Sequence, residues 1–275
     1  MTVLTILAAG SALDADPIAL LHAAHDAGFD GVGLRLSHGR AGSLTERRAW
    51  RRWAEDCGVL VHDVEVHRIG DGTSATPLLE AAAEVGAGRV LVVSDLSSRS
   101  HTFDELSAVV AQAATFGLEI GIEYMAWTTP SQPLDAADLA AAAGCVVVAD
   151  LLHHHRVGAG PAELQAIIEL GVLGWVQLCD APAAPPESLL DEARHARLAP
   201  GDGALPLAAL LAVIPDTAVC SVEVQSDVLA AMDVNARARL LRDATRAVLR
   251  PKGGLVSGPG GAAGGRWPPA PPPDR

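Results

Sequence analysis

The feature that most constrains the fold is a regular alternation of short apolar runs and helical patterns along the chain. Runs such as Arg89–Ser94 (RVLVVS) and residues 145–150 (CVVVAD) are apolar almost throughout and rich in β-branched residues. Such runs are typical of parallel strands that are buried on both faces. The expected strands are residues 3–8, 31–37, 60–67, 89–94, 119–125, 145–150, 173–178 and 218–224.

Each expected strand is followed by a helical segment, and the eight pairs together indicate one closed barrel. The expected helices are residues 17–28, 44–57, 77–85, 103–116, 133–143, 161–170, 206–213 and 228–249. Eight successive strand–helix units favour an α/β protein with the (β/α)8 TIM-barrel fold, a parallel eight-stranded barrel with outer helices. The open doubly wound sheet is the alternative, but the segment LAAGSALDA after the first strand lacks the GxGxxG spacing of a dinucleotide-binding turn.

Length and composition assign residues 1–250 to this barrel. A barrel of this kind typically needs ~250 residues, and the chain has 275. Beyond residue 250 the sequence becomes rich in Gly and Pro, with stretches such as GGAAGG and PPAPPP. Such a composition cannot bury enough apolar surface to fold, so we expect residues 251–275 to form a disordered tail.

The acidic charge bounds the class of ligand. A formal net charge of −13 argues against nucleic-acid binding, since contacts with phosphates need clustered Lys and Arg. A small-molecule substrate with a bound cation fits this balance better. We expect no membrane span, because no stretch is long and apolar enough. The four cysteines show no CxxC spacing, which predicts free thiols in a reducing cytoplasm.

Four polar side chains occur at or near the ends of four successive expected strands. These strand-end residues are Glu123, Asp150, Gln177 and Glu223. In a (β/α)8 barrel the functional side chains gather at the C-terminal ends of the strands. Buried carboxylates that lie close together repel one another unless a cation joins them, so we interpret the set as a site for one divalent metal ion. Carboxylate and amide oxygens suit Mg²⁺ or Mn²⁺, and Zn²⁺ or Co²⁺ also bind carboxylates.

Other residues near the expected barrel mouth allow two interpretations each. The third expected strand carries His62, Glu65 and His67 among apolar residues, and these three line the mouth or lie on the outer face of the barrel. Trp127 follows the fifth strand closely, and it forms a wall of the substrate pocket or packs in the core.

The order of these residues resembles the xylose-isomerase-like TIM-barrel superfamily of sugar isomerases and epimerases. The resemblance rests on Glu123, residues 150–153 (DLLH), Gln177, residues 197–203 (RLAPGDG) and Glu223. It covers the second half of the chain, whereas the first half matches only in its strand–helix rhythm and in the phrase GFDGVGLRL. Within this superfamily, the hydroxypyruvate-isomerase-like and inosose-isomerase-like members are the most similar at the third strand-end residue.

The resemblance implies a role for each residue. The four strand-end residues would hold one divalent metal, and His153 and Arg197 would bind oxygen atoms of the substrate. Gln177 stands where ketose 3-epimerases usually carry His, and Thr129 where they carry a further Glu. Gly33 stands where many relatives have Glu. These differences argue against a sugar 3-epimerase. Relatives commonly form dimers or tetramers, so a homo-oligomer is compatible with the resemblance.

The predicted chemistry is proton transfer next to a carbonyl group. A metal bound to a carbonyl and a neighbouring hydroxyl acidifies the C–H between them and stabilises the enediolate. Glu123 and Glu223 would then remove a proton and return it elsewhere. We therefore expect a metal-dependent isomerase or epimerase of a small sugar, polyol-ketone or hydroxy-keto acid. Two alternatives stay open: a metal-dependent lyase or dehydratase of the dehydroshikimate type, and a non-catalytic ligand-binding barrel.

Overall fold

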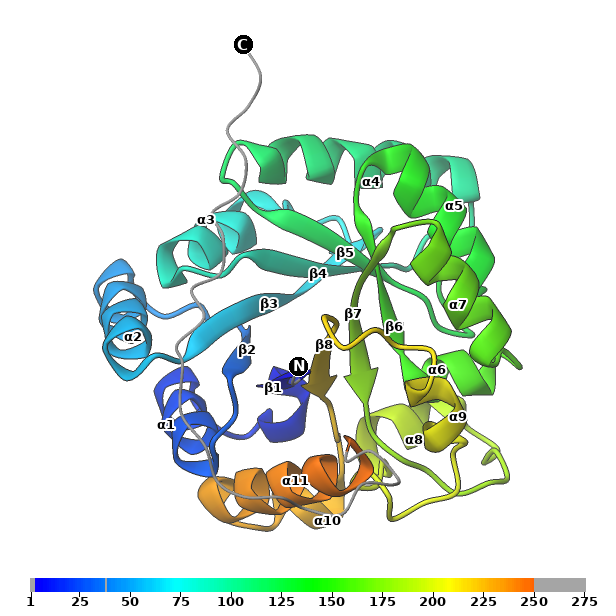
Figure 1. The fold of residues 1–275 in the computed structure, drawn as a ribbon. Coiled ribbons are helices and arrows are strands. Elements are labelled where there is room, and N and C mark those ends of the chain that lie inside the picture. The colour runs from blue at the N-terminus through cyan, green and yellow to red at the C-terminus, as the bar shows by residue number, and fades with distance from the viewer. Residues whose placement is uncertain (1–2, 38, 250–275) are drawn as a thin grey trace.

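Eight parallel strands close into a barrel in a computed structural model that describes residues 3–37 and 39–249 (Figure 1). Each strand pairs with its neighbours in chain order, and β8 pairs with β1 to complete the ring. The strands are β1 (Leu4–Leu7), β2 (Gly31–Arg35), β3 (Leu60–Ile69), β4 (Arg89–Ser94), β5 (Glu119–Glu123), β6 (Val146–Asp150), β7 (Leu173–Leu178) and β8 (Val219–Val222). The predicted (β/α)8 TIM barrel is confirmed.

Helices surround the barrel in Figure 1. They are η1 (Ala9–Ala12), α1 (Pro17–Ala27), α2 (Leu44–Cys57), α3 (Thr76–Val85), α4 (Arg99–Ala114), α5 (Pro133–Ala143), α6 (Leu151–Arg156), α7 (Pro161–Glu169), α8 (Leu189–His195), α9 (Leu207–Leu211), α10 (Asp227–Ala230) and α11 (Val234–Leu249). Local signals start several of them. Asp16 caps α1 by accepting the N–H of Ala19, and Ser43 and Glu46 form a capping box at α2.

The helices differ from the sequence prediction at several points. Helix α4 begins at Arg99, four residues before the predicted start, because Ser98 accepts the N–H of His101 and caps it. The predicted last helix is divided into α10 and α11. Two short helices that the sequence did not predict, α6 and α8, follow β6 and β7, and both contribute to the site described below.

Apolar side chains form two separate cores. The larger core fills the space between the outer face of the strands and the helices, and the smaller one fills the barrel interior. The interior core contains Ile6, Val66, Leu91, Val93, Met125, Val148, Trp175 and Val219. Gly121 lies against Trp175, since a Cβ atom at this glycine would come within 2.4 Å of the indole ring. The interior is therefore a packed floor, and polar groups above it lie at the barrel mouth.

The strand register directs the four strand-end residues to that mouth. Asp150 pairs with Gln177, and Gln177 pairs with Ser221. Alternate residues of a strand share a face, so Asp150 lies on the same face as the interior Val148 and Gln177 on the same face as the interior Trp175. Among the described residues no helix is long and apolar enough to cross a membrane. Residues 251–275, predicted as a tail, lie outside the described residues.

Candidate metal centre

The four strand-end residues are all buried at one end of the barrel. Glu123 and Asp150 are the last residues of β5 and β6, Gln177 precedes the last residue of β7, and Glu223 directly follows β8. Their exposed fractions range from 1% to 6%. A carboxylate this deeply buried needs a partner of opposite charge, or it takes up a proton. The question is therefore what compensates the three carboxyl groups.

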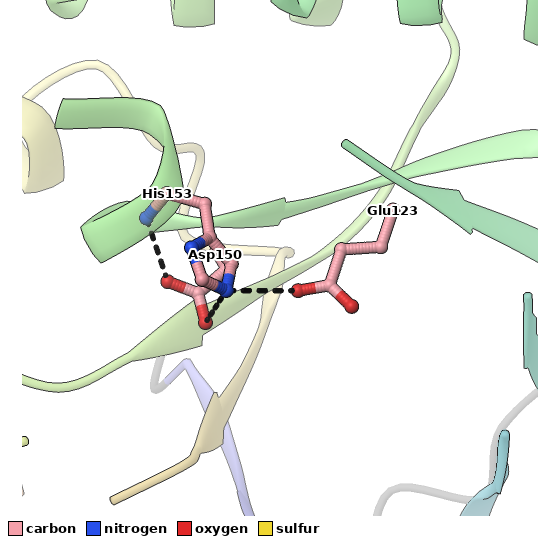
Figure 2. Close-up of side chains that lie close together, drawn as sticks. All are labelled: Glu123, Asp150 and His153. Carbon is pink, nitrogen blue, oxygen red and sulfur yellow. Dashed lines mark hydrogen bonds and ion pairs between the residues drawn. The ribbon is translucent and has the colours of Figure 1, made fainter. Parts of the chain in front are cut away.

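The side chains of Glu123, Asp150 and His153 point toward one another at this end of the barrel (Figure 2). Each offers one ligand atom, and these three atoms all lie within 4.8 Å of one another. The Nε2 atom of His153 is 3.7 Å from Oε1 of Glu123 and 3.9 Å from Oδ2 of Asp150. This spacing suits three groups around one cation after small adjustments. His153, predicted as a substrate-binding residue, thus also lies within reach of an ion.

Asp150 has its position fixed because it starts helix α6. Its Oδ1 accepts the backbone N–H groups of Leu152 at 2.7 Å and of His153 at 3.2 Å, as a helix N-cap does. The sequence Asp-Leu-Leu-His thus turns from strand to helix within one residue and brings His153 back beside the carboxylate. The second oxygen, Oδ2, faces the other groups of the site, and Nε2 of His153 lies 3.9 Å from it.

Arg197 is the buried cation of the site. Its Nη1 donates to Oδ2 of Asp150 at 2.5 Å, lies 3.5 Å from Oε2 of Glu223, and its Nη2 is 3.3 Å from Nε2 of His153. Its Nε donates to the carbonyl oxygen of Ala193 in α8 at 2.7 Å. Arg197 was predicted to bind substrate oxygens, and in this structure it contacts predicted metal ligands and also lines the cavity beside them.

One guanidinium does not compensate the whole site. Burial would raise the pKa of Asp150, but the Arg197 guanidinium outweighs that effect and holds the pKa below its usual value. The pKa of Glu123 is raised well above its usual value by burial and by the nearby carboxylates of Glu223 and Asp150. Burial also raises the pKa of Glu223, against the effect of Arg197. Arg197 thus does not fully neutralise Glu123 and Glu223, and a divalent cation would supply the missing positive charge.

Two further details fit a metal ion at this place. The Oε1 atom of Gln177 is buried and has no hydrogen-bond partner among the described residues. An unpaired buried acceptor of this kind costs ~1–3 kcal/mol, and a bound ion would explain why it is retained. Glu223 packs over Gly10, where a Cβ atom would come within 2.3 Å of the carboxylate. A glycine after β1 therefore leaves room for this side chain.

His153 and Trp127 line the cavity next to the cluster. Burial lowers the pKa of His153 to about 4, although the Asp150 carboxylate opposes this shift, so its imidazole is neutral at pH 7. The Trp127 ring meets the His153 ring edge-on, with centroids 5.2 Å apart. Both residues line one cavity of about 110 Å³, together with Glu123, Arg197 and Glu223.

The sequence did not decide the position of Glu65, which the structure places on the wall of the same cavity. Its Oε2 accepts a hydrogen bond at 3.0 Å from Nη1 of Arg35, the residue that pairs with it across β2 and β3. Burial and the Glu223 carboxylate raise the pKa of Glu65 to about 8, against the opposing charge of Arg35. The register between β3 and β4 shifts between Val64 and His67, which breaks the alternation on which the sequence prediction depended.

The donor set fits a divalent cation. Three carboxylates and an amide oxygen form a hard ligand set, and the neutral imidazole of His153 adds a nitrogen that Zn²⁺ or Mn²⁺ accepts. The side chains that would hold the ion are Glu123, Asp150, Gln177 and Glu223, with His153 beside them.

Comparison with known proteins places the fold among related barrels. No curated protein matches the chain. A structure of a xylose isomerase-like TIM barrel/4-hydroxyphenylpyruvate dioxygenase fusion protein is 24% identical with a TM-score of 0.75, and the match covers 90% of this chain and 42% of that one. The chain thus spans less than half the length of that protein.

Two other structures share nearly their whole length with the chain. The IolI protein with a bound zinc atom is 16% identical with a TM-score of 0.78, over 89% of this chain and 97% of its own. The probable 3-DHS dehydratase AsbF from Bacillus anthracis is 13% identical with a TM-score of 0.72, over 89% of this chain and 98% of its own. At these identities the likeness is one of fold. A family model described as "xylose isomerase-like TIM barrel" matches residues 21–249, and the chain therefore belongs to the xylose isomerase-like TIM barrel family.

Proposed function

We propose that this protein is a divalent-metal-dependent isomerase or epimerase of a small hydroxycarbonyl compound. The observation that carries the proposal is the convergence of four buried oxygen-donor side chains at the C-terminal ends of β5 to β8, one of which has an unpaired acceptor atom. The family described as xylose isomerase-like and the zinc atom bound by the IolI protein support it.

In this proposal, some cavity residues bind the substrate and others transfer protons. Glu123 and Glu223 come from β5 and from the residue after β8, and both carboxyl groups line the cavity. One carboxylate would remove a proton from a carbon next to the carbonyl, and the other would return a proton to the product. Arg197 would hold the developing negative charge through its guanidinium. His153, neutral at pH 7, would donate one N–H to a substrate oxygen.

A bound divalent cation would supply Lewis-acid polarisation of the substrate carbonyl, which makes the neighbouring C–H acidic. Trp127 and the α8 residues Leu190 and Ala193 line the cavity beside His153 and would reduce the contact of a bound substrate with water. Where water is excluded, each charged group acts more strongly on the reacting atoms than it would in water.

A second candidate function is a metal-dependent dehydratase. The probable 3-DHS dehydratase AsbF aligns over 89% of this chain, and elimination of water next to a carbonyl begins with the same removal of a proton. The products separate the two candidates. A dehydratase gives an unsaturated product that absorbs ultraviolet light, whereas an isomerase exchanges a carbon-bound proton with solvent and loses no water.

The proposal is tested by metal titration and by proton exchange. EDTA-treated protein is titrated with Mn²⁺, Mg²⁺, Co²⁺ and Zn²⁺ by calorimetry, and we expect one ion per chain. The metal-loaded protein is then incubated in D₂O with a panel of 2-ketoses and hydroxy-keto acids. NMR follows the exchange of carbon-bound protons for deuterium. We expect Glu123→Gln to weaken ion binding by more than about 100-fold, since even outer partners of metal ligands are worth 10- to 100-fold.

The matched control is Glu80→Gln, which changes an exposed glutamate in α3 and leaves both readouts unchanged. We expect Glu223→Gln to lower turnover by about 10²- to 10⁴-fold, the usual contribution of an acid–base group. The proposal is wrong if no divalent ion binds stoichiometrically, or if Glu223→Gln turns over the identified substrate as the unchanged protein does.

A further inference from the structure

Glu65 is a carboxyl group in the cavity that the proposed chemistry does not use. It lies on β3, on the side of the barrel opposite the β6–β7 pair, and its side chain is 3% exposed. The same cavity is lined by Glu123, His153 and Glu223. A buried carboxyl at such a place is retained only if neighbouring groups satisfy it.

The two oxygens of Glu65 differ in what surrounds them. Oε2 accepts the hydrogen bond from Arg35 at 3.0 Å, whereas Oε1 is buried without a hydrogen-bond partner among the described residues. The outer face of β3 is packed against the apolar core between strands and helices, with Val61, Val64 and Ile69 among its buried residues. Polar partners are therefore on the cavity side, where rotation of the carboxyl about its broad terminal torsion presents either oxygen.

Arg35 has spare hydrogen-bonding capacity next to Glu65. It also lines the cavity, and its side chain is 27% exposed, so its remaining N–H groups reach solvent or a ligand. A carboxyl and a guanidinium side by side offer an acceptor and several donors within one hydrogen-bond length. Two hydroxyl groups on adjacent carbons present the complementary pattern, because each hydroxyl both donates and accepts.

We propose that Glu65 and Arg35 form a hydroxyl-binding subsite on the β2–β3 wall of the cavity, which selects a polyhydroxylated substrate. This inference rests on the proposed function, because it names the substrate class of the same cavity. A sugar or polyol-ketone would place its carbonyl end at Glu123 and His153 and its hydroxyl-bearing end at Glu65. A three-carbon keto acid has no second hydroxyl to reach this wall.

The raised pKa of Glu65, about 8, agrees with such a role. A carboxyl group accepts a hydrogen bond from a hydroxyl group, and in its protonated form it also donates one. Glutamine keeps one donor and one acceptor at the same place, whereas leucine removes both and keeps the volume. The two substitutions therefore separate hydrogen bonding from packing.

The test measures polyol binding without any turnover. Xylitol and D-sorbitol are titrated by saturation-transfer NMR against the full chain as purified, with and without added Mg²⁺, in the unchanged protein and in Glu65→Leu and Glu65→Gln. We expect Glu65→Leu to weaken polyol binding by about tenfold or more, as the loss of a buried hydrogen bond does. Glu65→Gln stays within about threefold of the unchanged protein.

The outcomes are decisive in either direction. The inference is overturned if neither polyol binds the unchanged protein, or if Glu65→Leu binds the polyols as tightly as the unchanged protein does. Should Glu65→Leu fail to fold, a crystal of the unchanged protein soaked in xylitol gives the answer, since a hydroxyl must lie within hydrogen-bond distance of Glu65. Failure of the proposed function shows separately, as absent metal binding and absent proton exchange.

Discussion

At the residue scale, the unpaired amide oxygen of Gln177 is the most informative atom of the site. It lies on β7 beside Asp150, and no group among the described residues donates to it. Folded proteins rarely leave a buried acceptor unsatisfied. An atom in this state lowers the stability of the folded protein, and the proposed metal ion would give it a partner.

We predict opposite effects of Gln177→Leu on stability and on ion binding. Without metal, the variant should be as stable as the unchanged protein or more stable by up to about 1–3 kcal/mol, because it removes an unsatisfied buried amide. The rise in melting temperature on addition of Mn²⁺ or Zn²⁺ should shrink, because affinity for the ion is lost. Thermal denaturation with and without the ion measures both effects.

A glutamine outside the candidate metal centre provides the control for this variant. Gln165 is a surface residue of α7 that bonds to Glu169, and Gln165→Leu should leave the metal-dependent shift unchanged. If Gln177→Leu keeps the full shift, Gln177 is not a ligand.

The positions of the strand-end residues could be predicted, whereas those of Glu65 and Arg35 could not. Asp150 ends a continuous apolar run and Gln177 lies one residue before the end of another, so their place at the mouth follows from strand length. Glu65 lies in the middle of the ten-residue strand β3, next to a register shift. Because a bulge changes which residues face inward, alternation along the sequence does not assign a face there.

At the element scale, helices α6 and α8 hold the site together from outside the barrel. Arg156 at the end of α6 donates two hydrogen bonds, of 2.8 Å and 2.7 Å, to the carboxylate of Glu192 in α8. Both side chains are nearly inaccessible, at 4% and 3%. The pair fixes α8 next to α6, and the carbonyl oxygen of Ala193 then receives Nε of Arg197.

We predict that Glu192→Gln destabilises the protein by about 3–5 kcal/mol, the usual effect of leaving one charge of a buried pair without its partner. Local opening of α8 should increase more than opening elsewhere, because Arg156 is its link to α6. Hydrogen exchange of the amides of residues 189–195 measures this effect, and denaturant unfolding measures the global loss.

The exposed pair Arg51–Glu55 in α2 provides a comparison. Glu55→Gln removes a solvent-screened partner and should cost less than about 1 kcal/mol. Equal losses for the two variants would contradict the role given to the α6–α8 link.

Helix α6 could not be predicted from the sequence, whereas α8 has a local start signal, since Ser188 caps it by accepting the N–H of Asp191. The segment LLHHHR of α6 is only six residues long and contains three histidines, which have no strong helix preference. This helix forms because Asp150 caps it and because Arg156 donates a hydrogen bond to Glu192, which lies 36 residues further along the chain. Local sequence patterns contain no information on such a contact, whereas the longer helices α2 and α5 show caps or proline starts of their own.

At the scale of the whole molecule, closure of the barrel depends on contacts between the first and last strands. Ser11 follows β1, and its hydroxyl donates to the carbonyl oxygen of Val222 and accepts the N–H of Val224, both at 2.8 Å. The sequence separation of these pairs exceeds 200 residues. They form only when the complete ring has assembled.

We predict that Ser11→Ala lowers the free energy of unfolding by about 1–3 kcal/mol, because a buried carbonyl and a buried N–H lose their partner. The loss should appear in a single cooperative unfolding transition, since this seam, the Ser11 contacts with Val222 and Val224, joins the first and last strands of one ring. Circular dichroism during thermal unfolding measures it. Ser107→Ala is the control, because the Ser107 hydroxyl has no partner among the described residues. Equal stability of the two variants would contradict the role of this seam.

The guanidinium of Arg197 has a consequence for how this protein would take up the proposed metal ion in the cell. Since Arg197 already neutralises Asp150 and lies beside Glu223, these two carboxylates do not need an ion to hold them in place. Zinc fingers, by contrast, stay unfolded until they load their ion. A newly made chain of this barrel would therefore wait in a folded apo form, and its working fraction would follow the supply of free metal rather than the rate of folding.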